Sequence, residues 1–132
     1  FITNALDGEA LPLYGDGRQV RDWLFVEDHC AGIEFVLREG KPGEIYNVGS
    51  TERVTINELA QRVIELTDSS SDTVLLPYDE VYGQGIEDML HRQPAIEKVR
   101  DAIGWEPTRS LEAILADVVA FVRTAPIFDE AV

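Results

Sequence analysis

Apolar residues recur every three or four positions in two segments, and this spacing predicts amphipathic helices at residues 55–67 and 110–123. Thr55 and Glu58 stand at the spacing of a capping box, in which each side chain satisfies a free backbone N–H at the helix start. Ser110 is expected to cap the second helix. The residues expected to face the core are Ile56, Leu59, Ala60, Val63 and Leu66 in the first helix, and Leu111, Ile114, Leu115, Val118 and Val122 in the second.

Shorter patterns predict the other elements. Helices are expected at residues 1–7, 27–38 and 97–103, ended by Gly8, Gly40 and Gly104. The stripe expected to be buried on the helix at 27–38 is Cys30, Ile33, Val36 and Leu37. Strand-forming residues predict strands at 20–26, 44–48 and 74–76. Because helices and strands mix without a regular βαβ order, we expect an α/β fold, an irregular lobe that forms one domain over residues 1–132.

Residues 78–94 show no sustained period, and irregular stretches of this length are usually functional or disordered. Tyr78, Tyr82 and an expected buried Met89 argue against disorder. A tight turn is expected earlier in the chain, at residues 15–17, whose sequence is Gly-Asp-Gly.

The charge balance narrows the classes of partner. The chain of 132 residues has 25 acidic and 11 basic residues and a net charge of −14, so nucleic acids and anionic membranes are disfavoured. Nine of the basic residues are arginine, a balance that also occurs in salt-adapted proteins. An anionic ligand would therefore have to be bound by a few well-placed arginines.

A cytoplasmic location is the expectation from the remaining composition. The sequence has no apolar run near the roughly 20 residues of a membrane span and no signal peptide. Cys30 is the single cysteine, which rules out an internal disulfide.

The sequence lacks the residues that several kinds of functional site require. The glycine pairs at 15–17 and 83–85 are not followed by the third glycine of a dinucleotide-binding fingerprint, so we expect no cofactor site in this chain. His29 and Cys30 are adjacent and point apart on a helix, which argues against a metal site. We instead expect Cys30 in the core and His29 at a rim. No tyrosine is followed four residues later by lysine, so the proton-transfer pair of short-chain dehydrogenases is absent.

Residues 11–29 carry a family resemblance, with the sequence Leu-Pro-Leu-Tyr-Gly-Asp-Gly-Arg-Gln-Val-Arg-Asp-Trp-Leu-Phe-Val-Glu-Asp-His. This segment resembles the extended short-chain dehydrogenase/reductases that act on sugar nucleotides, and it is most similar to dTDP-glucose 4,6-dehydratases. Residues 44–49, 55–59 and 103–107 continue the match. Residues 82–94 are more similar to UDP-glucuronate decarboxylases of the lipid-A modification type and to some epimerases of the superfamily.

The resemblance implies a division of labour along a longer protein. In this superfamily the N-terminal part is a Rossmann domain that holds NAD and the proton-transfer residues, and the C-terminal part binds the nucleotide sugar. Since the chain begins with Phe1 and lacks both motifs, we expect a C-terminal substrate-binding fragment of a homodimeric NAD-dependent epimerase/dehydratase. We expect this chain alone to be inactive. The alternative class is a non-catalytic module that binds a nucleotide sugar or a partner chain.

Arg21 and Tyr14 are the first candidate ligand-binding residues. Arg21 matches the family arginine that binds the sugar-nucleotide diphosphate, and a guanidinium fork suits two phosphate oxygens. Its alternative role is a local ion pair with Asp22 or Asp16. Tyr14 matches a position beside the nucleotide base, and the alternative is a tyrosine of the core or of a strand surface.

Arg92 is the third candidate. The match to the decarboxylases places it by the sugar, where an arginine at its ordinary pKa favours electrostatic stabilisation over proton transfer. The alternative is a surface ion pair with Glu87 or Asp88. The other polar or aromatic residues of interest are expected to be structural: Glu27 and Asp28 as charges at a helix N-terminus, Tyr46 and Asn47 at a strand end, and Trp23, Trp105 and Phe35 in the core.

Overall fold

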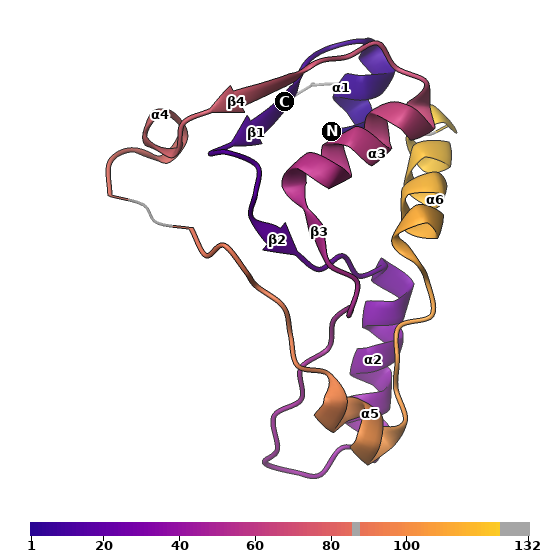
Figure 1. Cartoon of the computed structure of the whole chain (residues 1–132). Coiled ribbons are helices and arrows are strands. Elements are labelled where there is room, and N and C mark those ends of the chain that lie inside the picture. Colours follow the sequence, from indigo (N-terminus) through magenta and orange to yellow (C-terminus); the bar gives the residue numbers. More distant parts are fainter. Residues whose placement is uncertain (86–87, 125–132) are drawn as a thin grey trace, which may run out of the picture.

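The computed structural model describes residues 1–85 and 88–124 of the chain. The polypeptide forms an upper layer, in which helices α1, α3 and α6 pack beside the short strands, and a lower part that holds α2 and α5 (Figure 1). The helices are α1 (Ile2–Asp7), α2 (Val26–Glu39), α3 (Ile56–Thr67), α4 (Tyr78–Tyr82), α5 (Glu97–Ile103) and α6 (Leu111–Thr124). The strands are β1 (Leu11–Tyr14), β2 (Val20–Arg21), β3 (Val54–Thr55) and β4 (Thr73–Leu76). The irregular α/β lobe is confirmed.

The strands form two separate two-stranded sheets. β1 pairs with β4 in parallel, with Leu11 opposite Thr73 and Tyr14 opposite Leu76. β2 pairs antiparallel with β3, and Val20 makes a further isolated bridge to His91. Parallel pairing requires a long crossover, which here includes α3.

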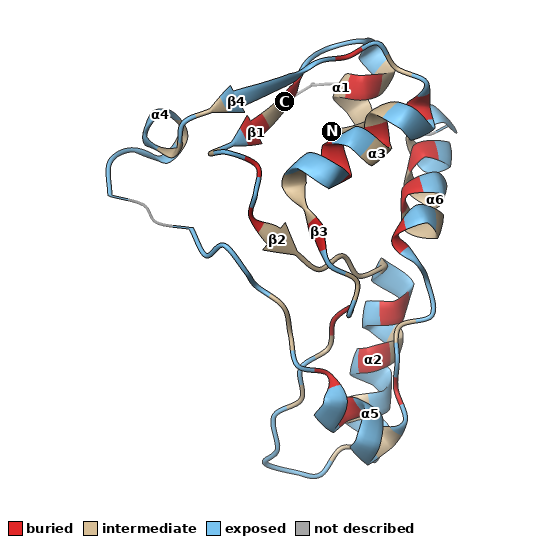
Figure 2. Cartoon of the chain, in the orientation of Figure 1, coloured by how far each residue is buried: buried red, intermediate tan, exposed pale blue. Residues whose placement is uncertain are grey.

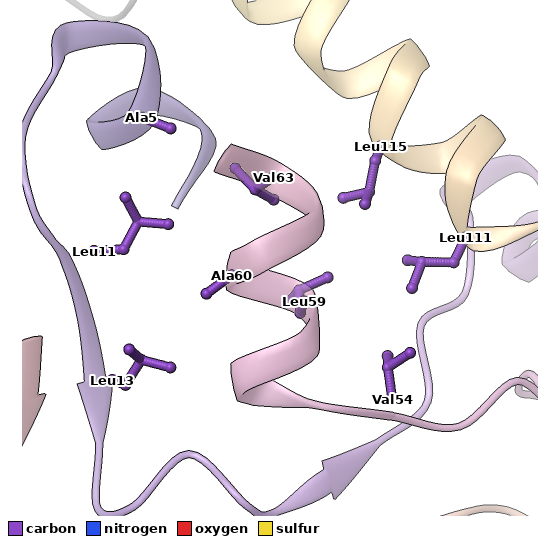
Figure 3. Close-up of a cluster of buried hydrophobic side chains, with 9 residues drawn as sticks. All are labelled: Ala5, Leu11, Leu13, Val54, Leu59, Ala60, Val63, Leu111 and Leu115. Atoms are coloured by element: carbon purple, nitrogen blue, oxygen red, sulfur yellow. The ribbon is translucent and has the colours of Figure 1, made fainter. Parts of the chain in front are cut away.

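Helix α3 is the centre of the upper core, as its sequence pattern predicts. The capping box is present: the Glu58 backbone N–H donates to Thr55 Oγ1 over 3.1 Å, and the Thr55 N–H donates to the Glu58 carboxylate over 2.7 Å. The Thr55 N–H and hydroxyl, which both donate to the Glu58 carboxylate, lower its pKa. The inner face of α3 packs between β1 and α6 (Figure 3). The core residues drawn there are Ala5, Leu11, Leu13, Val54, Leu59, Ala60, Val63, Leu111 and Leu115.

The predicted inner faces need three corrections. Leu66 is 43% exposed and lines a shallow surface cavity together with Leu115 of α6. Val119, which was not predicted, is buried in α6, where Leu111, Leu115 and Val119 follow a four-residue period that selects one narrow face. Met89, expected to be buried, is 59% exposed.

Helix α2 buries only part of the predicted apolar stripe, since Val36 alone is partly buried, against the cluster of Ile96, Val99 and Trp105. Cys30, Ile33 and Leu37 are exposed, and the exposed residues cover most of α2 in Figure 2. Its buried residues are Asp28 and Gly32. A side chain at Gly32 would overlap Val48 and Trp105. The face of α2 that packs against these two residues is therefore the one that carries glycine, and not the one that carries large apolar residues.

Two predicted strands are shorter or absent. Strand formers fill residues 20–26, but the described strand ends at Arg21, because β3 supplies only two partner residues. Residues 44–48 form no strand with any described residue, and Ile45 is 81% exposed. Trp105 is buried as predicted, Trp23 is partly buried against the upper core, and Phe35 is 44% exposed.

A buried carboxylate joins α2 to the segment that leads into α6. Asp28 is 6% exposed and accepts hydrogen bonds from the Thr108 hydroxyl over 2.7 Å and from the backbone N–H groups of Thr108 and Arg109 over 3.0 and 3.1 Å. It also lies in the first turn of α2, where negative charge is favoured. Three donors compensate the burial of one charged group.

Among the described residues, no helix has both the length and the apolar character that crossing a bilayer requires.

Asp28→Ala is expected to lower the free energy of unfolding by about 1–3 kcal/mol, because buried donors would lose their acceptor. Chemical denaturation of the full-length protein measures this difference. Asp117→Ala is the matched control, since it removes a half-exposed carboxylate that pairs with Arg109 at 2.8 Å. A surface pair of this kind contributes about 0–1 kcal/mol. Equal losses in the two variants would contradict the role given to Asp28.

Candidate functional site

A cavity of about 730 Å³ lies between α1, β1, β2, the start of α3, α4 and the segment that follows α4. All three residues predicted to bind a ligand, Tyr14, Arg21 and Arg92, line it. The other lining residues are Phe1, Asn4, Pro12, Gln19, Ile56, Tyr78, Tyr82 and Asp88. The fold therefore brings together candidates that come from separate parts of the sequence.

Arg21 forms four contacts that hold its guanidinium group in one plane. Nη1 donates to the carbonyl oxygens of Val20 and Met89, over 2.8 and 2.9 Å. Nη2 lies 2.6 Å from each carboxylate oxygen of Asp88. The partner is therefore Asp88, and not Asp16 or Asp22 as in the local alternative. Asp22 instead accepts a hydrogen bond from the backbone N–H of Ser50.

Tyr78 and Gln19 extend the contacts of Arg21 and Asp88 into a hydrogen-bonded chain. The Tyr78 hydroxyl donates to Asp88 Oδ2 over 2.8 Å and accepts from Gln19 Nε2 over 2.7 Å. The same amide nitrogen donates to the Tyr14 carbonyl oxygen over 2.8 Å. Burial and the neighbouring Asp88 raise the pKa of Tyr78 to about 12, so its hydroxyl remains a donor at neutral pH.

Three tyrosines make one wall of the cavity aromatic. The Tyr14 and Tyr82 rings meet edge to face with their centroids 5.7 Å apart, and the Tyr78 and Tyr82 rings stack with centroids 6.1 Å apart. Tyr14 is 38% exposed and Tyr82 is 53% exposed. Flat aromatic surface that is open to solvent suits the face of a planar ligand.

Arg92 reaches the cavity from the irregular segment. Its backbone N–H donates to the Val20 carbonyl oxygen over 3.2 Å, and this bond fixes the segment along β2. Its guanidinium forms no ion pair with any residue between 1 and 85 or between 88 and 124. Asp88 pairs with Arg21 instead, and Glu87 lies outside the described residues.

The Gly-Asp-Gly turn at residues 15–17 shapes the cavity wall. Gly15 and Gly17 have φ of +74° and +68°, which only glycine adopts readily. A β-carbon at Gly15 would overlap the Tyr78 ring. The second glycine is covered by Asn57, whose side-chain amide donates to the Asp16 carbonyl oxygen over 3.0 Å. The turn thus lets α3 and Tyr78 approach the backbone closely.

The described part of the chain contains no cluster of three metal-ligating side chains. His29 lines a smaller cavity of about 410 Å³ beside α2, together with Tyr46, Asn47 and Pro94. The side-chain amide of Asn47 donates to the Ala95 carbonyl oxygen over 3.3 Å. Cys30 is exposed and not in the core, since α2 turns that face outward.

Sequence reasoning missed Gln19, Tyr78 and Asp88 as site residues. Asp88 was considered only as an alternative ion-pair partner of Arg92, but it meets Arg21, 67 positions away. A usable signal was present: three tyrosines and one carboxylate fall in or beside segments that also carry the two candidate arginines.

Comparison with known proteins gives one consistent family. Residues 1–118 match the family described as GDP-mannose 4,6 dehydratase. A Haloferax volcanii protein named low-salt glycan biosynthesis protein Agl12 is 41% identical over 115 residues, which cover 85% of this chain and 34% of that protein. A dTDP-glucose 4,6-dehydratase of Xanthomonas campestris is 41% identical over 93% of this chain and 36% of its own length. A UDP-N-acetyl-alpha-D-glucosaminuronate decarboxylase of Bacillus cytotoxicus is 36% identical over 93% of this chain and 38% of its own length.

Solved structures agree with these relatives. A dTDP-glucose 4,6-dehydratase from Bacillus anthracis, in complex with NAD, superposes with a TM-score of 0.81 and 35% identity over 92% of this chain and 37% of that one. A UDP-glucose 4-epimerase from Thermotoga maritima, with UDP-glucose, superposes with a TM-score of 0.82 and 28% identity over 92% of this chain and 37% of that one. The predicted resemblance to this superfamily is confirmed. The chain spans about a third of the length of the curated relatives it matches.

Gly15→Ala is expected to destabilise the protein more than Gly8→Ala does. Both glycines have φ of +74°, but a β-carbon at Gly8 meets nothing within 4 Å. The control therefore measures the conformational penalty alone, about 1–2 kcal/mol. The additional loss of stability in Gly15→Ala reports the overlap with Tyr78. This difference between the two variants should disappear when Tyr78 is also replaced by alanine in each of them. Denaturant midpoints measure these differences, and equal losses in the two single variants would contradict the interpretation.

Proposed function

This chain belongs to the GDP-mannose 4,6 dehydratase family, and we propose that it is the nucleotide-sugar-binding part of an NAD-dependent epimerase/dehydratase, most like a dTDP-glucose 4,6-dehydratase. The observation that carries the proposal is the cavity itself. It gathers two arginines, a single carboxylate (Asp88) and three tyrosines in a chain whose net charge is −14. Local positive charge in so acidic a protein favours a specific anionic site.

The two sides of the cavity suit the two ends of a nucleoside diphosphate. The guanidinium groups of Arg21 and Arg92 supply planar donors for phosphate oxygens. The rings of Tyr14 and Tyr82 supply an aromatic surface for a base. We therefore assign the diphosphate to the arginines and the base to the tyrosines, with the sugar nearest Arg92.

A longer protein would divide the work between its parts. This chain has neither a glycine fingerprint for NAD nor a Tyr-x-x-x-Lys pair, so its residues do not fit the cofactor. We assign NAD and proton transfer to a preceding Rossmann domain. This chain would bind the diphosphate and orient the sugar, so that binding energy far from the reacting carbon supports the rate.

We further propose which reaction the complete enzyme catalyses. Dehydration is favoured by the dehydratase relatives, and decarboxylation and epimerisation are the alternatives that the other relatives and residues 82–94 support. A cytoplasmic homodimer is proposed for the complete enzyme. The competing proposal is a module that binds a nucleotide sugar without catalysis, which an absence of turnover in the full-length protein would favour.

Arg21→Ala in the full-length protein is expected to weaken binding of the nucleotide sugar by about 1.5–3 kcal/mol, the scale of hydrogen bonds to a charged group. NAD affinity should not change. Isothermal titration measures both. Arg18→Ala is the matched control, because Arg18 is exposed, pairs weakly with Asp16 at 3.9 Å and lies outside the cavity. A loss of NAD binding with normal binding of the nucleotide sugar would overturn the role of Arg21.

Arg92→Lys is expected to lower turnover about tenfold to a thousandfold, the range for losing one electrostatic donor, with a smaller change in substrate affinity. Lysine keeps the charge and loses the planar fork. Steady-state kinetics with dTDP-glucose, UDP-glucose and UDP-glucuronate would measure the change and identify the reaction. Arg38→Lys is the control on the exposed surface of α2. Normal turnover of the Arg92 variant would contradict a role in catalysis and favour the alternative, a surface ion pair.

A further inference from the structure

We propose that Asp88 is an internal competitor for the phosphate site: its carboxylate occupies the edge of Arg21 that a nucleoside diphosphate would use, and the ligand must displace it. This inference rests on the proposed function, because it takes Arg21 as the diphosphate-binding residue. Asp88 would then set how much negative charge a ligand needs in order to bind at Arg21.

The geometry at Arg21 shows that the guanidinium does not need Asp88 to stay in place. Nη1 is held by the carbonyl oxygens of Val20 and Met89, and these two bonds already fix the plane of the group. Asp88 uses the other terminal nitrogen, with both oxygens 2.6 Å from Nη2. Asp88 thus occupies one oriented terminal nitrogen of the guanidinium, whose N–H groups could donate to a phosphate oxygen as well as to a carboxylate.

Asp88 also lies on the solvent side of the pair. Its side chain is 33% exposed, whereas that of Arg21 is 11% exposed. Both residues line the cavity, and the carboxylate is the more exposed of the two. Asp88 itself lies in neither a helix nor a strand, so its displacement breaks no regular element.

The carboxylate keeps a hydrogen-bond partner when it leaves Arg21. Tyr78 donates to Asp88 Oδ2 over 2.8 Å, and Gln19 fixes the Tyr78 hydroxyl over 2.7 Å. A displaced carboxylate without any donor would be strongly unfavourable, and the tyrosine reduces that penalty. Tyr78 therefore makes the exchange feasible, and Asp88 determines how much free energy the exchange costs.

The charges of the ligands determine which of them must displace Asp88. Asp88 neutralises Arg21, so a ligand has to offer more than one carboxylate does in order to take its place. A nucleoside diphosphate carries several negative charges and two phosphates, a monophosphate carries fewer, and a nucleoside carries none. A ligand that displaces Asp88 pays the full cost of breaking this pair, and a ligand that cannot displace it loses only its own contact with Arg21. Asp88 should therefore penalise the diphosphate at least as much as the monophosphate, and should not affect the nucleoside.

The test is isothermal titration of the full-length protein and its Asp88→Asn variant with UDP, UMP and uridine, and in parallel with dTDP, dTMP and thymidine. The variant removes the competing charge but keeps an oxygen that accepts from Tyr78. We expect diphosphate binding to tighten about tenfold, monophosphate binding to tighten by no more than this factor, and nucleoside binding to stay unchanged. Weaker or unchanged diphosphate binding by a folded variant would overturn the proposal.

Asp79→Asn is the matched control, because it removes one exposed negative charge in α4 without touching Arg21. An equal gain in the control would show a general charge effect and would also overturn the proposal. Tyr78→Phe provides a second line of evidence, since it removes only the hydroxyl that would receive the displaced carboxylate. It should weaken diphosphate binding in the unmodified protein and have little effect in the Asp88→Asn background. Additive effects of the two substitutions would contradict the exchange.

Arg21→Ala separates this inference from the proposed function. If Arg21→Ala leaves diphosphate affinity unchanged, the assignment of the phosphate site fails. If Arg21→Ala weakens binding while Asp88→Asn does not strengthen it, only the role of Asp88 fails.

Discussion

The two-residue strand β2 is the constraint on which the cavity depends, because both of its edges are occupied. One edge pairs with β3. On the other, the Val20 N–H donates to the Leu90 carbonyl oxygen over 2.7 Å, and the Val20 carbonyl accepts from Arg92. The adjacent Arg21 side chain donates hydrogen bonds to Met89 and Asp88 of the same irregular segment. Without these bonds the segment would have no regular partner, and the wall that carries Arg92 and Asp88 would not be fixed.

Local sequence signals predicted the elements that depend on local physics. The helix at 56–67 was predictable because its capping box and buried face are short-range features, and Gly104 closes α5 in the left-handed conformation as expected. The mixed lobe and the positions of Tyr14, Arg21 and Arg92 at one site followed from pattern and resemblance. The partner of Arg21 did not, because an ion pair between distant segments leaves no periodic trace in a single sequence.

The failed predictions have a common physical origin. A strand requires a partner, and residues 44–48 have none within the described chain, although their composition suits a strand. The apolar stripe of α2 marks a surface suited to burial, yet this chain packs its glycine face inward and leaves Ile33 and Leu37 exposed. Apolar patterning identifies surface that favours burial, but it does not identify what covers that surface.

The separation of 67 residues between Arg21 and Asp88 has a consequence for the order of folding. Bringing such distant segments together requires closing a long loop before any contact compensates the lost chain entropy. Contacts within α3 and α6 are local and form sooner, as do those of short turns. The ligand cavity should therefore be among the last features to assemble, and a destabilised chain would lose it while its helices persist.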